Sequence, residues 1–391
     1  MKKLRILSIN HTEEFEGGTE VFKNKFCKEL RKRGHKVLEL TLSKNFGEIK
    51  KEKIVLKVVS NNVLRKFLGV TFYPSLYRKI KRIIKDFKPD IIHFHNIEKF
   101  PLTILLASKR NKIVKTINDY GIICPTMWCI KKKKNTVCEA GFGFKCLKCL
   151  NVFEFAVHFV LSVVKNKFYK KYIGAFISPS KLQYEYITKH GYRNVFLLEN
   201  FLLYDKISKF NKNKKIKKNY FLYIGQITKQ KGIEVMANAF LKFSKNKNFK
   251  LIVIGGGPEK EKYEKKFSSE KIKFLGRVDD TTKFTYMQNA LAIIIPSLWM
   301  ETGPHVGMEA MLLNKPIISS DIGGMTDYVI DKKNGLFFRR GSSEDLAQKL
   351  IFFVKNKKIF KDIYKTNKGV LRKYSVEHFI KGLLTIYEKV M

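Results

Sequence analysis

Short apolar runs alternate with longer amphipathic stretches along almost the whole chain of 391 residues. The apolar runs have the length of buried strands, and the stretches between them carry apolar residues at helical spacing. Strands that alternate with helices assemble into parallel sheets, so this pattern predicts an α/β protein. Hydrophobic residues make up 45% of the chain, which argues against a disordered or fibrous protein.

The alternation occurs twice. The strands predicted in the first half are Leu4–Ile9, Val37–Thr41, Ile54–Val59, Ile91–Phe94, Ile113–Thr116, Ala175–Ile177 and Val195–Leu198. The helices predicted there cover 19–33, 75–87, 101–109, 152–169 and 180–189. The strands predicted in the second half are Phe221–Ile224, Lys250–Ile254, Ile272–Phe274, Leu291–Ile295, Pro316–Ser319 and Gly335–Phe338. The helices predicted there cover 232–244, 258–267, 304–313 and 343–355, and a last amphipathic helix covers 375–391.

The stretch Asp205–Asn219 separates the halves, because it is polar, lysine-rich and without periodicity. We therefore expect two Rossmann-like, doubly wound domains facing a central cleft, at 1–200 and 201–374. We expect the helix at 375–391 to pack back on the first domain. Ligands of such sheets bind beyond the carboxyl ends of the strands.

The charge balance is strongly basic, with 78 Lys and Arg against 34 Asp and Glu. Only 12 of the basic residues are Arg, and the lysines are spread over the whole chain. Scattered lysine favours solvated surfaces over a nucleic-acid site, which would show a compact basic patch. No apolar run is long enough to cross a bilayer, and Leu4–Ile9, interrupted by Arg5, is typical of a strand and not of an export signal. The cytoplasm is the expected compartment.

The segment from Trp299 to Glu309, WMETGPHVGME, is the strongest local signal. Glu301 falls in a predicted loop and Glu309 in the helix that follows. Free N–H groups at the start of that helix, near Gly303 and Pro304, favour a bound anion such as a diphosphate. The two carboxylates could accept hydrogen bonds from sugar and ribose hydroxyls. The alternative is a surface acid and a salt-bridged helix acid.

Further glycine and lysine residues follow other predicted strands. They occur in Ile224–Gly232 (IGQITKQKG), in Leu251–Pro258 (LIVIGGGP) and at Gly323-Gly324. Glycines allow close approach of the backbone to a ligand, and a lysine in such a turn can reach a phosphate. Taken singly, each pattern is equally typical of a solvated turn.

In this order and spacing, the set resembles the group 1, or family 4, retaining glycosyltransferases of the GT-B fold. The residues that carry the resemblance in the second half are Gly225, Lys231-Gly232, Gly255–Pro258, Phe274–Gly276, Pro296-Ser297, Glu301, Glu309–Met311, Lys315-Pro316 and Gly323-Gly324. Looser matches in the first half are Gly17-Gly18, Gly34-His35, Pro89-Asp90, Ile92–His95 and Ser178–Ser180.

The resemblance implies a donor site for a UDP- or GDP-sugar in the second domain and an acceptor site in the first. Glu301 would hold the donor sugar, Glu309 the ribose hydroxyls, and Lys231 would neutralise the leaving diphosphate. The other residues that the resemblance places at the donor are Gly17, Gly18, Gly225, Gln226, Lys229, Thr302, Gly303, Pro304, His305 and Val306. The anomeric configuration would be retained.

Two positions depart from the family pattern. Gln226 stands where the family usually has Arg, so one phosphate cation is missing and Lys229 replaces it only in part. Asn118 stands where the family often has His at the end of the strand 113–116; it can hydrogen-bond a sugar hydroxyl but does not titrate. The sequence holds no Asp-x-Asp triad, which favours a site without a catalytic metal ion.

Five of the six cysteines lie within the predicted insertion 124–149. The spacing of Cys129, Cys138, Cys146 and Cys149, which ends in C-x2-C, is compatible with a structural zinc site. Unligated buried thiols, or a disulfide in an oxidising compartment, are the alternatives.

After the cysteines, the apolar stretch Val152–Val164 runs into a basic, aromatic segment at Lys165–Tyr172. This arrangement suggests docking of Lys165–Tyr172 on an anionic membrane surface, and a buried helix with a solvated basic end is the alternative. The resemblance favours the membrane, because many such transferases glycosylate lipid-linked acceptors from the cytoplasmic side.

The function expected from these observations is transfer of a hexose to a glycan or lipid-linked glycan in polysaccharide biosynthesis. The protein would act in the cytoplasm, peripherally on the inner membrane face. A nucleotide-sugar epimerase of the same fold is one alternative, and a basic nucleic-acid-binding protein is another, although nucleic acid is not an expected partner.

Overall fold

The computed structural model describes residues 2–11, 18–43, 47–58, 72–98, 100–129, 138–202, 219–245 and 247–391. The chain divides into two compact units. One contains the described residues up to Asn200 together with Glu377–Met391, and the other contains Phe201–Val376. Most of the lysine-rich stretch that we interpreted as a domain boundary, Asp205–Asn219, lies outside the described residues.

The first unit is built on an eight-stranded sheet in the order β3-β4-β2-β1-β5-β6-β7-β8. Its strands are β1 (Arg5–His11), β2 (Lys36–Ser43), β3 (Glu48–Lys50), β4 (Lys53–Lys57), β5 (Ile91–Phe94), β6 (Ile113–Thr116), β7 (Ala175–Ser178) and β8 (Val195–Leu197). Its helices are α1 (Gly18–Lys32), α3 (Pro74–Phe87), α4 (Pro101–Ser108), η1 (Phe144–Lys148), α5 (Val152–Tyr172), α6 (Lys181–Lys189) and α14 (Val376–Val390). All neighbouring strands pair in parallel except β3 and β4.

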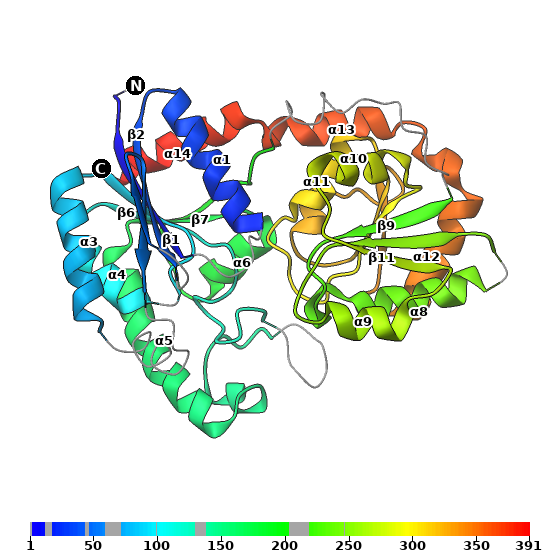
Figure 1. Cartoon of the computed structure of the whole chain (residues 1–391), viewed down its shortest axis with the longest axis horizontal. Helices are drawn as coiled ribbons and strands as arrows, with labels where there is room; N and C mark the ends of the chain where they lie inside the picture. Colours follow the sequence, from blue (N-terminus) through cyan, green and yellow to red (C-terminus); the bar gives the residue numbers. More distant parts are fainter. Residues whose placement is uncertain are drawn as a thin grey trace. The chain divides into compact units, whose positions relative to one another are not determined.

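The carboxy-terminal helix α14 packs on the first unit beside α1, as Figure 1 shows. Phe379 of α14 meets the rings of Phe22 and Phe26 of α1. Tyr387 Oη lies 2.6 Å from Nδ1 of His93, which is fully buried on β5. Sequence-remote elements thus share one helical layer of this unit.

The second unit is built on a six-stranded parallel sheet in the order β11-β10-β9-β12-β13-β14. Its strands are β9 (Tyr220–Ile224), β10 (Lys250–Ile254), β11 (Ile272–Gly276), β12 (Ile293–Ile295), β13 (Ile317–Ser320) and β14 (Gly335–Phe338). Its helices are α8 (Ile233–Ser244), α9 (Lys260–Phe267), α10 (Asp280–Asn289), α11 (His305–Leu312), α12 (Ser343–Lys355) and α13 (Ile363–Leu371), with short turns η2 (Lys229–Lys231), η3 (Gly323–Asp327), η4 (Lys357–Phe360) and η5 (Arg372–Tyr374).

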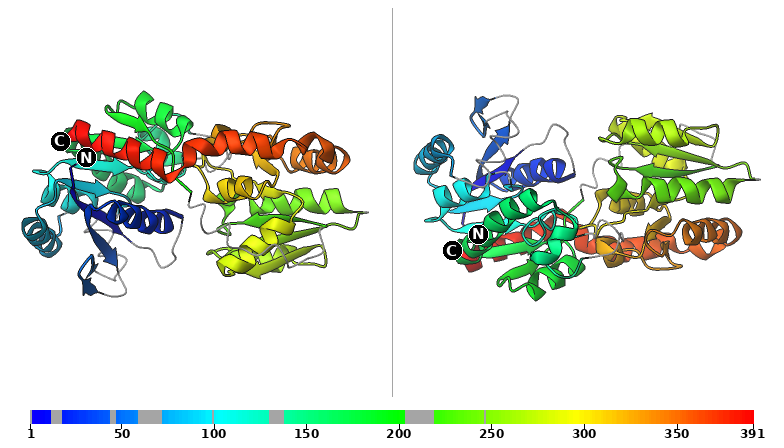
Figure 2. Two further views of the ribbon diagram at one scale, coloured as in Figure 1. Left: turned by 90° about the horizontal axis from the view of Figure 1, so that it is seen from above. Right: turned by 90° about the horizontal axis from the view of Figure 1, so that it is seen from below.

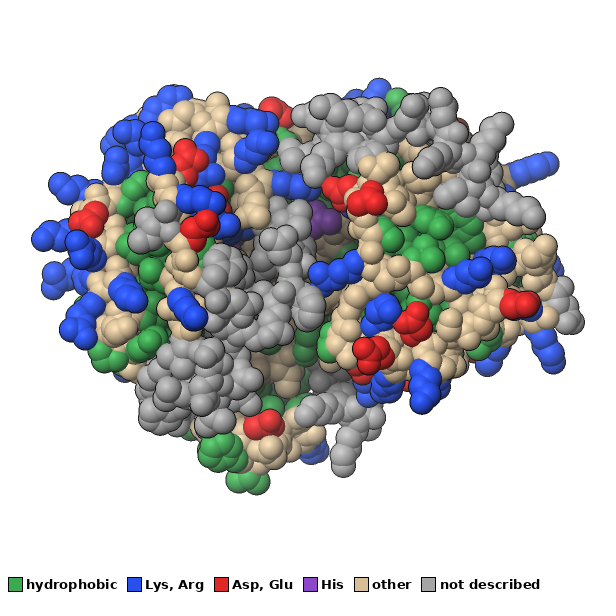
Figure 3. All heavy atoms as spheres, viewed as in Figure 1, with side chains coloured by type: hydrophobic (Ala, Val, Ile, Leu, Met, Phe, Trp, Pro, Cys, Tyr) green, Lys and Arg blue, Asp and Glu red, His purple; other side chains and the backbone are tan. Residues whose placement is uncertain are grey.

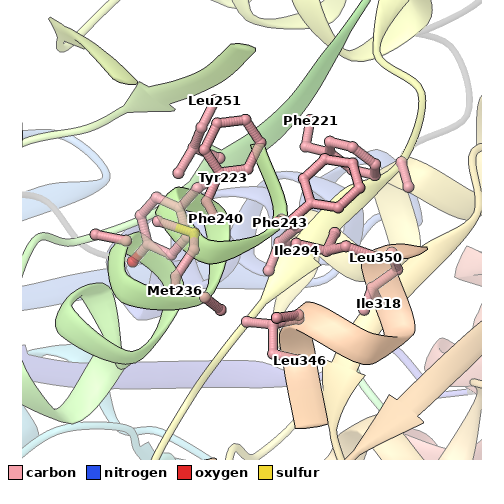
Figure 4. Close-up of a cluster of buried hydrophobic side chains, with 14 of the residues drawn as sticks. Phe221, Tyr223, Met236, Phe240, Phe243, Leu251, Ile294, Ile318, Leu346 and Leu350 are labelled. Atoms are coloured by element: carbon pink, nitrogen blue, oxygen red, sulfur yellow. The ribbon is translucent and has the colours of Figure 1, made fainter. Parts of the chain in front are cut away.

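Both faces of this sheet are apolar, because successive strand residues point to opposite sides and both sides are covered. On one face, side chains such as Phe221 and Leu251 pack against α8, α9 and α12 (Figure 4). On the other, Leu222 and Ile252 pack against α10, α11 and the end of α13. Figure 2 shows the helices on both sides of the sheet.

The structure confirms the predicted fold class of two Rossmann-like α/β units. None of the helices in the described part of the chain combines the length and the apolar character needed to span a bilayer.

Candidate functional site

The candidate site of the second unit lies where the direction of strand order reverses. Strands β9 and β12 are neighbours in the sheet, although two strands separate them in sequence. Helices α8 and α11, which follow them, cover opposite faces. The loops after β9 and β12 therefore diverge, and ligands of open α/β sheets bind at such a crevice.

Two predicted residues meet at this point, one from each loop. Lys231 ends η2 after β9, and its Nζ lies 2.6 Å from Oε1 of Glu301 in the loop after β12. The Glu301 side chain is only 5% exposed and that of Lys231 is 20% exposed. Ser297 Oγ donates a 2.5 Å hydrogen bond to the same carboxylate oxygen. A buried carboxylate is thus neutralised and oriented by one cation and one hydroxyl.

Trp299 completes the surroundings of this pair. Its ring is buried, and Lys231 Nζ lies 5.3 Å from the ring centroid, within the range of a cation–π interaction. The ring limits the volume that the lysine side chain can explore. It therefore helps to hold the cation beside Glu301.

Two glycines let the loops approach this closely. Gly232 has a φ of +72°, and a Cβ on it would lie 1.8 Å from the carbonyl oxygen of Pro296. Gly323, with a φ of +75°, would bring a Cβ within 2.4 Å of the Glu301 nitrogen. Any side chain at either position would push the Glu301 loop away from its neighbours.

Helix α11 begins beside Glu301. Its N-terminal residue is preceded by Pro304, and no side chain caps its first N–H groups. Thr302, Gly303, Pro304, His305 and Val306 are half-buried around this end. Uncapped N–H groups and the positive end of the helix dipole favour an anion.

Glu309 is the fifth residue of α11, and its partner differs from that of Glu301. Lys283 Nζ of α10 is 2.9 Å from Glu309 Oε1 and 3.3 Å from Asp280 Oδ1. The Glu309 side chain is mostly buried. The structure thus places both predicted glutamates in the second unit, each held by its own lysine.

The remaining predicted residues of this unit lie at the ends of neighbouring strands. Gly225 follows β9, and the exposed Gln226 accepts a 2.7 Å hydrogen bond from Tyr223 Oη through its carbonyl. The exposed Lys229 donates its backbone N–H to Glu259 at 2.5 Å.

The predicted residues of the first unit belong to other elements. Asn118 follows β6 and is half-buried. Gly18 is the first residue of α1, whereas Gly17 lies outside the described residues. The structure describes each unit by itself, so their roles at the donor remain predictions.

A buried ionic network lies beside Asn118 and was not predicted from the sequence. Lys115 Nζ and Lys165 Nζ lie 3.0 and 3.3 Å from the two carboxylate oxygens of Glu98. Burial opposes ionisation of Glu98, but the two cations outweigh it and lower its pKa to about 2. Burial, reinforced by the Glu98 charge, raises the pKa of Asp119 to about 6.

This network fixes part of the segment Lys165–Tyr172, which the sequence suggested as a membrane-docking surface. Lys165 and Tyr169 are buried, whereas Lys167, Lys170 and Lys171 are exposed, so docking through this segment stays a prediction. Lys165 also donates to the carbonyl oxygen of Gly121. The carboxy-terminal half of α5 is therefore an anchor within the first unit, because its central lysine is committed to Glu98.

The cysteines of the insertion are unbridged. Cys129 and Cys146 are buried, and Cys138 and Cys149 are half-buried. Among the described residues, no three His, Cys, Asp or Glu side chains are arranged to hold a metal ion. The four thiols do not form a ready zinc site here, so structural zinc remains a prediction, which elemental analysis of the purified protein would test.

Three residues of the glutamate surroundings had no assigned role in the sequence analysis. Ser297 was named among the residues that carry the resemblance, and Trp299 begins the quoted segment, but neither was given a role at the site. Lys283 lies on α10, a helix that the apolar pattern does not reveal. The partner of Glu309 could therefore not be named.

Family models match two parts of the chain. Residues 205–370 match the model described as glycosyl transferases group 1, and residues 16–123 match glycosyltransferase family 4. An uncharacterized glycosyltransferase of Methanocaldococcus jannaschii is 24% identical over 344 residues, covering 85% of each chain. Alpha-monoglucosyldiacylglycerol synthase of Acholeplasma laidlawii is 24% identical over 371 residues, covering 90% of this chain and 89% of that protein.

Solved structures share the fold over nearly the full length. A crystal structure of Anabaena Alr3699/HepE in complex with UDP-glucose has a TM-score of 0.71 at 16% identity, covering 98% of this chain and 100% of that chain. Sucrose-phosphate synthase of Thermosynechococcus elongatus has a TM-score of 0.74 at 15% identity, covering 98% of both chains. With two Rossmann-like units, the glutamate pair and matches to both family models, the chain belongs to the group 1 glycosyltransferases of the GT-B fold.

Proposed function

We propose that this glycosyltransferase moves a hexose from a UDP- or GDP-sugar to a hydroxyl of a glycan or lipid-linked glycan, with retention of the anomeric configuration. The observation that carries the proposal is the Lys231–Glu301 pair at the strand-order reversal of the second unit. It supplies one cation and one oriented carboxylate next to the uncapped start of α11.

The chemistry assigned to each residue follows from its charge and position. Lys231 would stabilise the negative charge that grows on the leaving diphosphate, together with the N–H groups of α11. Glu301, held by Ser297, would accept hydrogen bonds from the donor sugar. Glu309 would accept them from the ribose. A bound diphosphate would compete with Glu301 for the Lys231 cation.

We further propose that the reaction needs no metal ion. The sequence has no Asp-x-Asp triad of the kind that holds a diphosphate through a divalent cation. Lys231 and the helix terminus would supply the positive charge for the diphosphate instead. A transfer assay with and without chelator tests this part separately.

The donor and acceptor classes draw support from similar proteins. HepE was crystallised with UDP-glucose, and a relative from Acholeplasma laidlawii is named for a glucosylated diacylglycerol product. These names favour a nucleotide sugar as donor and admit a lipid as acceptor. Action at the cytoplasmic membrane face, in polysaccharide biosynthesis, would fit such an acceptor.

A thermal-shift screen of the full chain against nucleotide sugars is the first test. A specific donor should raise the melting temperature by mass action, and the matching nucleoside diphosphate should do so too. Incubation of that donor with candidate acceptors, followed by NMR of the product, then reports the anomeric configuration. Conversion of the donor into another nucleotide sugar without an acceptor would identify an epimerase and overturn the proposal, as would an inverted product.

A further inference from the structure

Six large apolar side chains are exposed on one part of the first unit, which consists of η1 and of α5 as far as Val163. We call this set the apolar tip; its members are Phe144, Leu147, Val152, Phe153, Phe159 and Val163. Phe144, Val152 and Phe153 are 76, 76 and 79% exposed. In Figure 3, hydrophobic side chains gather at the lower end of the view, where Figure 1 shows the start of α5.

The tip is locally well built, so its exposure is a property of an ordered element. Asn151 and Glu154 form a capping box at the start of α5: Asn151 Oδ1 accepts from the Glu154 nitrogen at 2.7 Å. The one acidic residue of this turn is thus used to begin the helix. The rings of Phe142 and Phe155 stack with centroids 5.9 Å apart, and Phe155 also meets the rings of Phe144 and Phe159 of the tip.

The opposite end of α5 is fixed inside the unit. Lys165 pairs with Glu98, and Tyr169 is fully buried. Because the carboxy-terminal part of α5 is anchored in this way, the apolar face of its amino-terminal part stays exposed to solvent. Exposed aromatic residues in a contiguous patch mark an interaction surface more often than a solvated one.

The surroundings of the tip match an anionic lipid surface. Lys145 and Lys148 are exposed on η1 between the apolar side chains, and the whole chain carries a formal net charge of +44. Phenylalanines inserted among lysines are typical of elements that lie in the interface of a bilayer. Anionic headgroups attract such lysines, and salt weakens the attraction.

A cavity of about 300 Å³ adjoins the tip and shares Phe159 and Val163 with it. Its polar lining includes Asn166, Lys170 and His190. Lys170 Nζ lies 4.8 Å from the ring centroid of Tyr192, which holds the cation at the cavity wall. An apolar rim beside a cationic wall is complementary to a phospholipid, whose chains are apolar and whose headgroup carries a negatively charged phosphate.

We propose that the apolar tip is a membrane-docking surface that inserts into anionic phospholipid bilayers, with a headgroup phosphate in the adjoining cavity. The apolar side chains of this surface precede Lys165–Tyr172, the segment that the sequence suggested, whereas Asn166 and Lys170 of the adjoining cavity belong to that segment. Docking through this surface does not depend on which sugar is transferred, so its failure would leave the proposed reaction standing.

Sedimentation of the full chain with vesicles tests the proposal. The protein should bind vesicles of equimolar phosphatidylcholine and phosphatidylglycerol, bind phosphatidylcholine vesicles weakly, and lose affinity as salt rises to about 0.5 M. The double variant Phe144→Ser with Phe153→Ser should lower the partition coefficient at least about tenfold. Burying one phenylalanine side chain in the bilayer already contributes more free energy than a tenfold change in partitioning requires. Lys170→Gln should reduce the preference for anionic vesicles.

A matched control removes exposed apolar side chains from the other unit. Ile359 and Tyr364, which are 36 and 58% exposed, can both be changed to Ser, and vesicle binding should not change. Insertion is separated from surface adsorption by Phe153→Trp, whose fluorescence should shift to the blue on anionic vesicles. No binding by the parent protein, or equal binding by the double serine variant, would overturn the proposal. So would a dimer in solution that the double variant dissociates, because the tip would then be an interface between copies.

Discussion

Glu301 and Glu309 have different partners, and this difference gives them separable roles. Glu301 shares one oxygen between Lys231 and Ser297, beside the uncapped start of α11. Glu309 pairs with Lys283 of α10. A carboxylate that binds the ribose contributes equally to the affinity of the donor and of the free nucleoside diphosphate. A carboxylate that binds the sugar stabilises the donor only, and this stabilisation is strongest in the transition state, when positive charge grows on the anomeric carbon.

We therefore predict opposite signatures for two conservative variants. Glu309→Gln should raise the dissociation constants of nucleoside diphosphate and nucleotide sugar by a similar factor, roughly tenfold. Glu301→Gln should leave nucleoside diphosphate affinity nearly intact and lower turnover on the order of 10²-fold. Calorimetric titration and steady-state kinetics measure the two effects.

Glu344→Gln is a suitable control for both variants. Glu344 pairs with Lys242 at 2.5 Å but is 63% exposed and lies on α12. This substitution should change neither binding nor turnover, because exposed pairs contribute little. If Glu301→Gln weakened diphosphate binding as much as Glu309→Gln does, the assigned roles would be wrong.

Gln226 offers a gain-of-affinity test. Its side chain is exposed at the end of β9, close in sequence to Lys231. Gln226→Arg should tighten nucleoside diphosphate binding by about 1–2 kcal/mol, since arginine adds a charged, forked donor. Gln348→Arg, on the exposed side of α12, adds the same charge elsewhere and should not tighten binding. Unchanged affinity at Gln226→Arg would mean that other groups already neutralise the diphosphate.

Asp119 should make the stability of the protein fall as pH rises. Its pKa is raised to about 6 by burial and by Glu98, so the stabilisation from its protonated form is complete below about pH 4 and lost as pH passes 6. Glu98 acts in the opposite sense: its pKa is lowered to about 2, so its contribution is present above about pH 4.5 and disappears only in strong acid.

Asp119→Asn should therefore raise the free energy of unfolding at pH 7–8 and flatten its pH dependence between pH 4 and 7. The amide oxygen can still accept the 2.6 Å hydrogen bond from the Gly121 nitrogen. Urea unfolding across this pH range measures the effect. A variant that is less stable than the parent at pH 8 would contradict the prediction.

At the scale of elements, the sequence predicted those with a strong apolar period. Strands β5, β6, β10 and β14 and helix α12 have the predicted bounds. Helix α10 was missed because its sequence, DTTKFTYMQN, is polar and rich in threonine, and only Phe284 and Met287 are buried. Its start is fixed by Asp279, whose side chain accepts a hydrogen bond from the Thr282 nitrogen at 2.9 Å. A single Asp is too common in the sequence to identify a helix start by itself.

The candidate site was predictable only in part for the same reason. Glycines and glutamates at strand ends are visible in the sequence, so Lys231, Glu301 and Glu309 could be named. The partner of Glu309 could not be named, because Lys283 lies on the missed helix. The Glu98 network of the first unit could not be named either, because Glu98, Lys115 and Lys165 come from three separate segments of the chain. Side-chain pairing across a fold depends on packing, which a single sequence does not display.

Helix α14 gives a prediction at the element scale. Burial, aided by Lys115, lowers the pKa of His93 to about 3, so its ring is neutral and one nitrogen donates while the other accepts. Its nitrogens lie 2.6 Å from Tyr387 Oη and 2.7 Å from Thr116 Oγ1. Tyr387→Phe should destabilise the first unit by about 1–3 kcal/mol, because it leaves the buried Nδ1 of His93 without a hydrogen-bond partner.

Equilibrium unfolding measures this loss, and Tyr77→Phe on the half-buried side of α3 serves as the control. The control variant should stay within about 0.5 kcal/mol of the parent, as surface substitutions usually do. Equal stability of Tyr387→Phe and the parent would mean that a water or another group replaces the lost hydroxyl.

At the scale of the whole molecule, the two units have separate cores and each contains one of the chain's two tryptophans. Trp128 lies in the first unit, and Trp299 lies in the second beside Lys231. Trp128→Phe leaves a reporter of the second unit, and Trp299→Phe leaves a reporter of the first. Fluorescence can therefore follow the unfolding of each unit by itself. This separation matters because a single free energy of unfolding is not well defined for a chain with two units.

We predict that nucleoside diphosphate stabilises mainly the second unit, because Lys231, the α11 terminus and Glu309 all belong to it. At about 100 times the dissociation constant, the unfolding transition seen by Trp299 should gain about 2.7 kcal/mol. The transition seen by Trp128 should move much less. A ligand that binds residues of both units, Gly17 and Gly18 included, would instead shift both transitions together. Equal shifts would thus contradict a donor site confined to the second unit and would favour a contribution from the first.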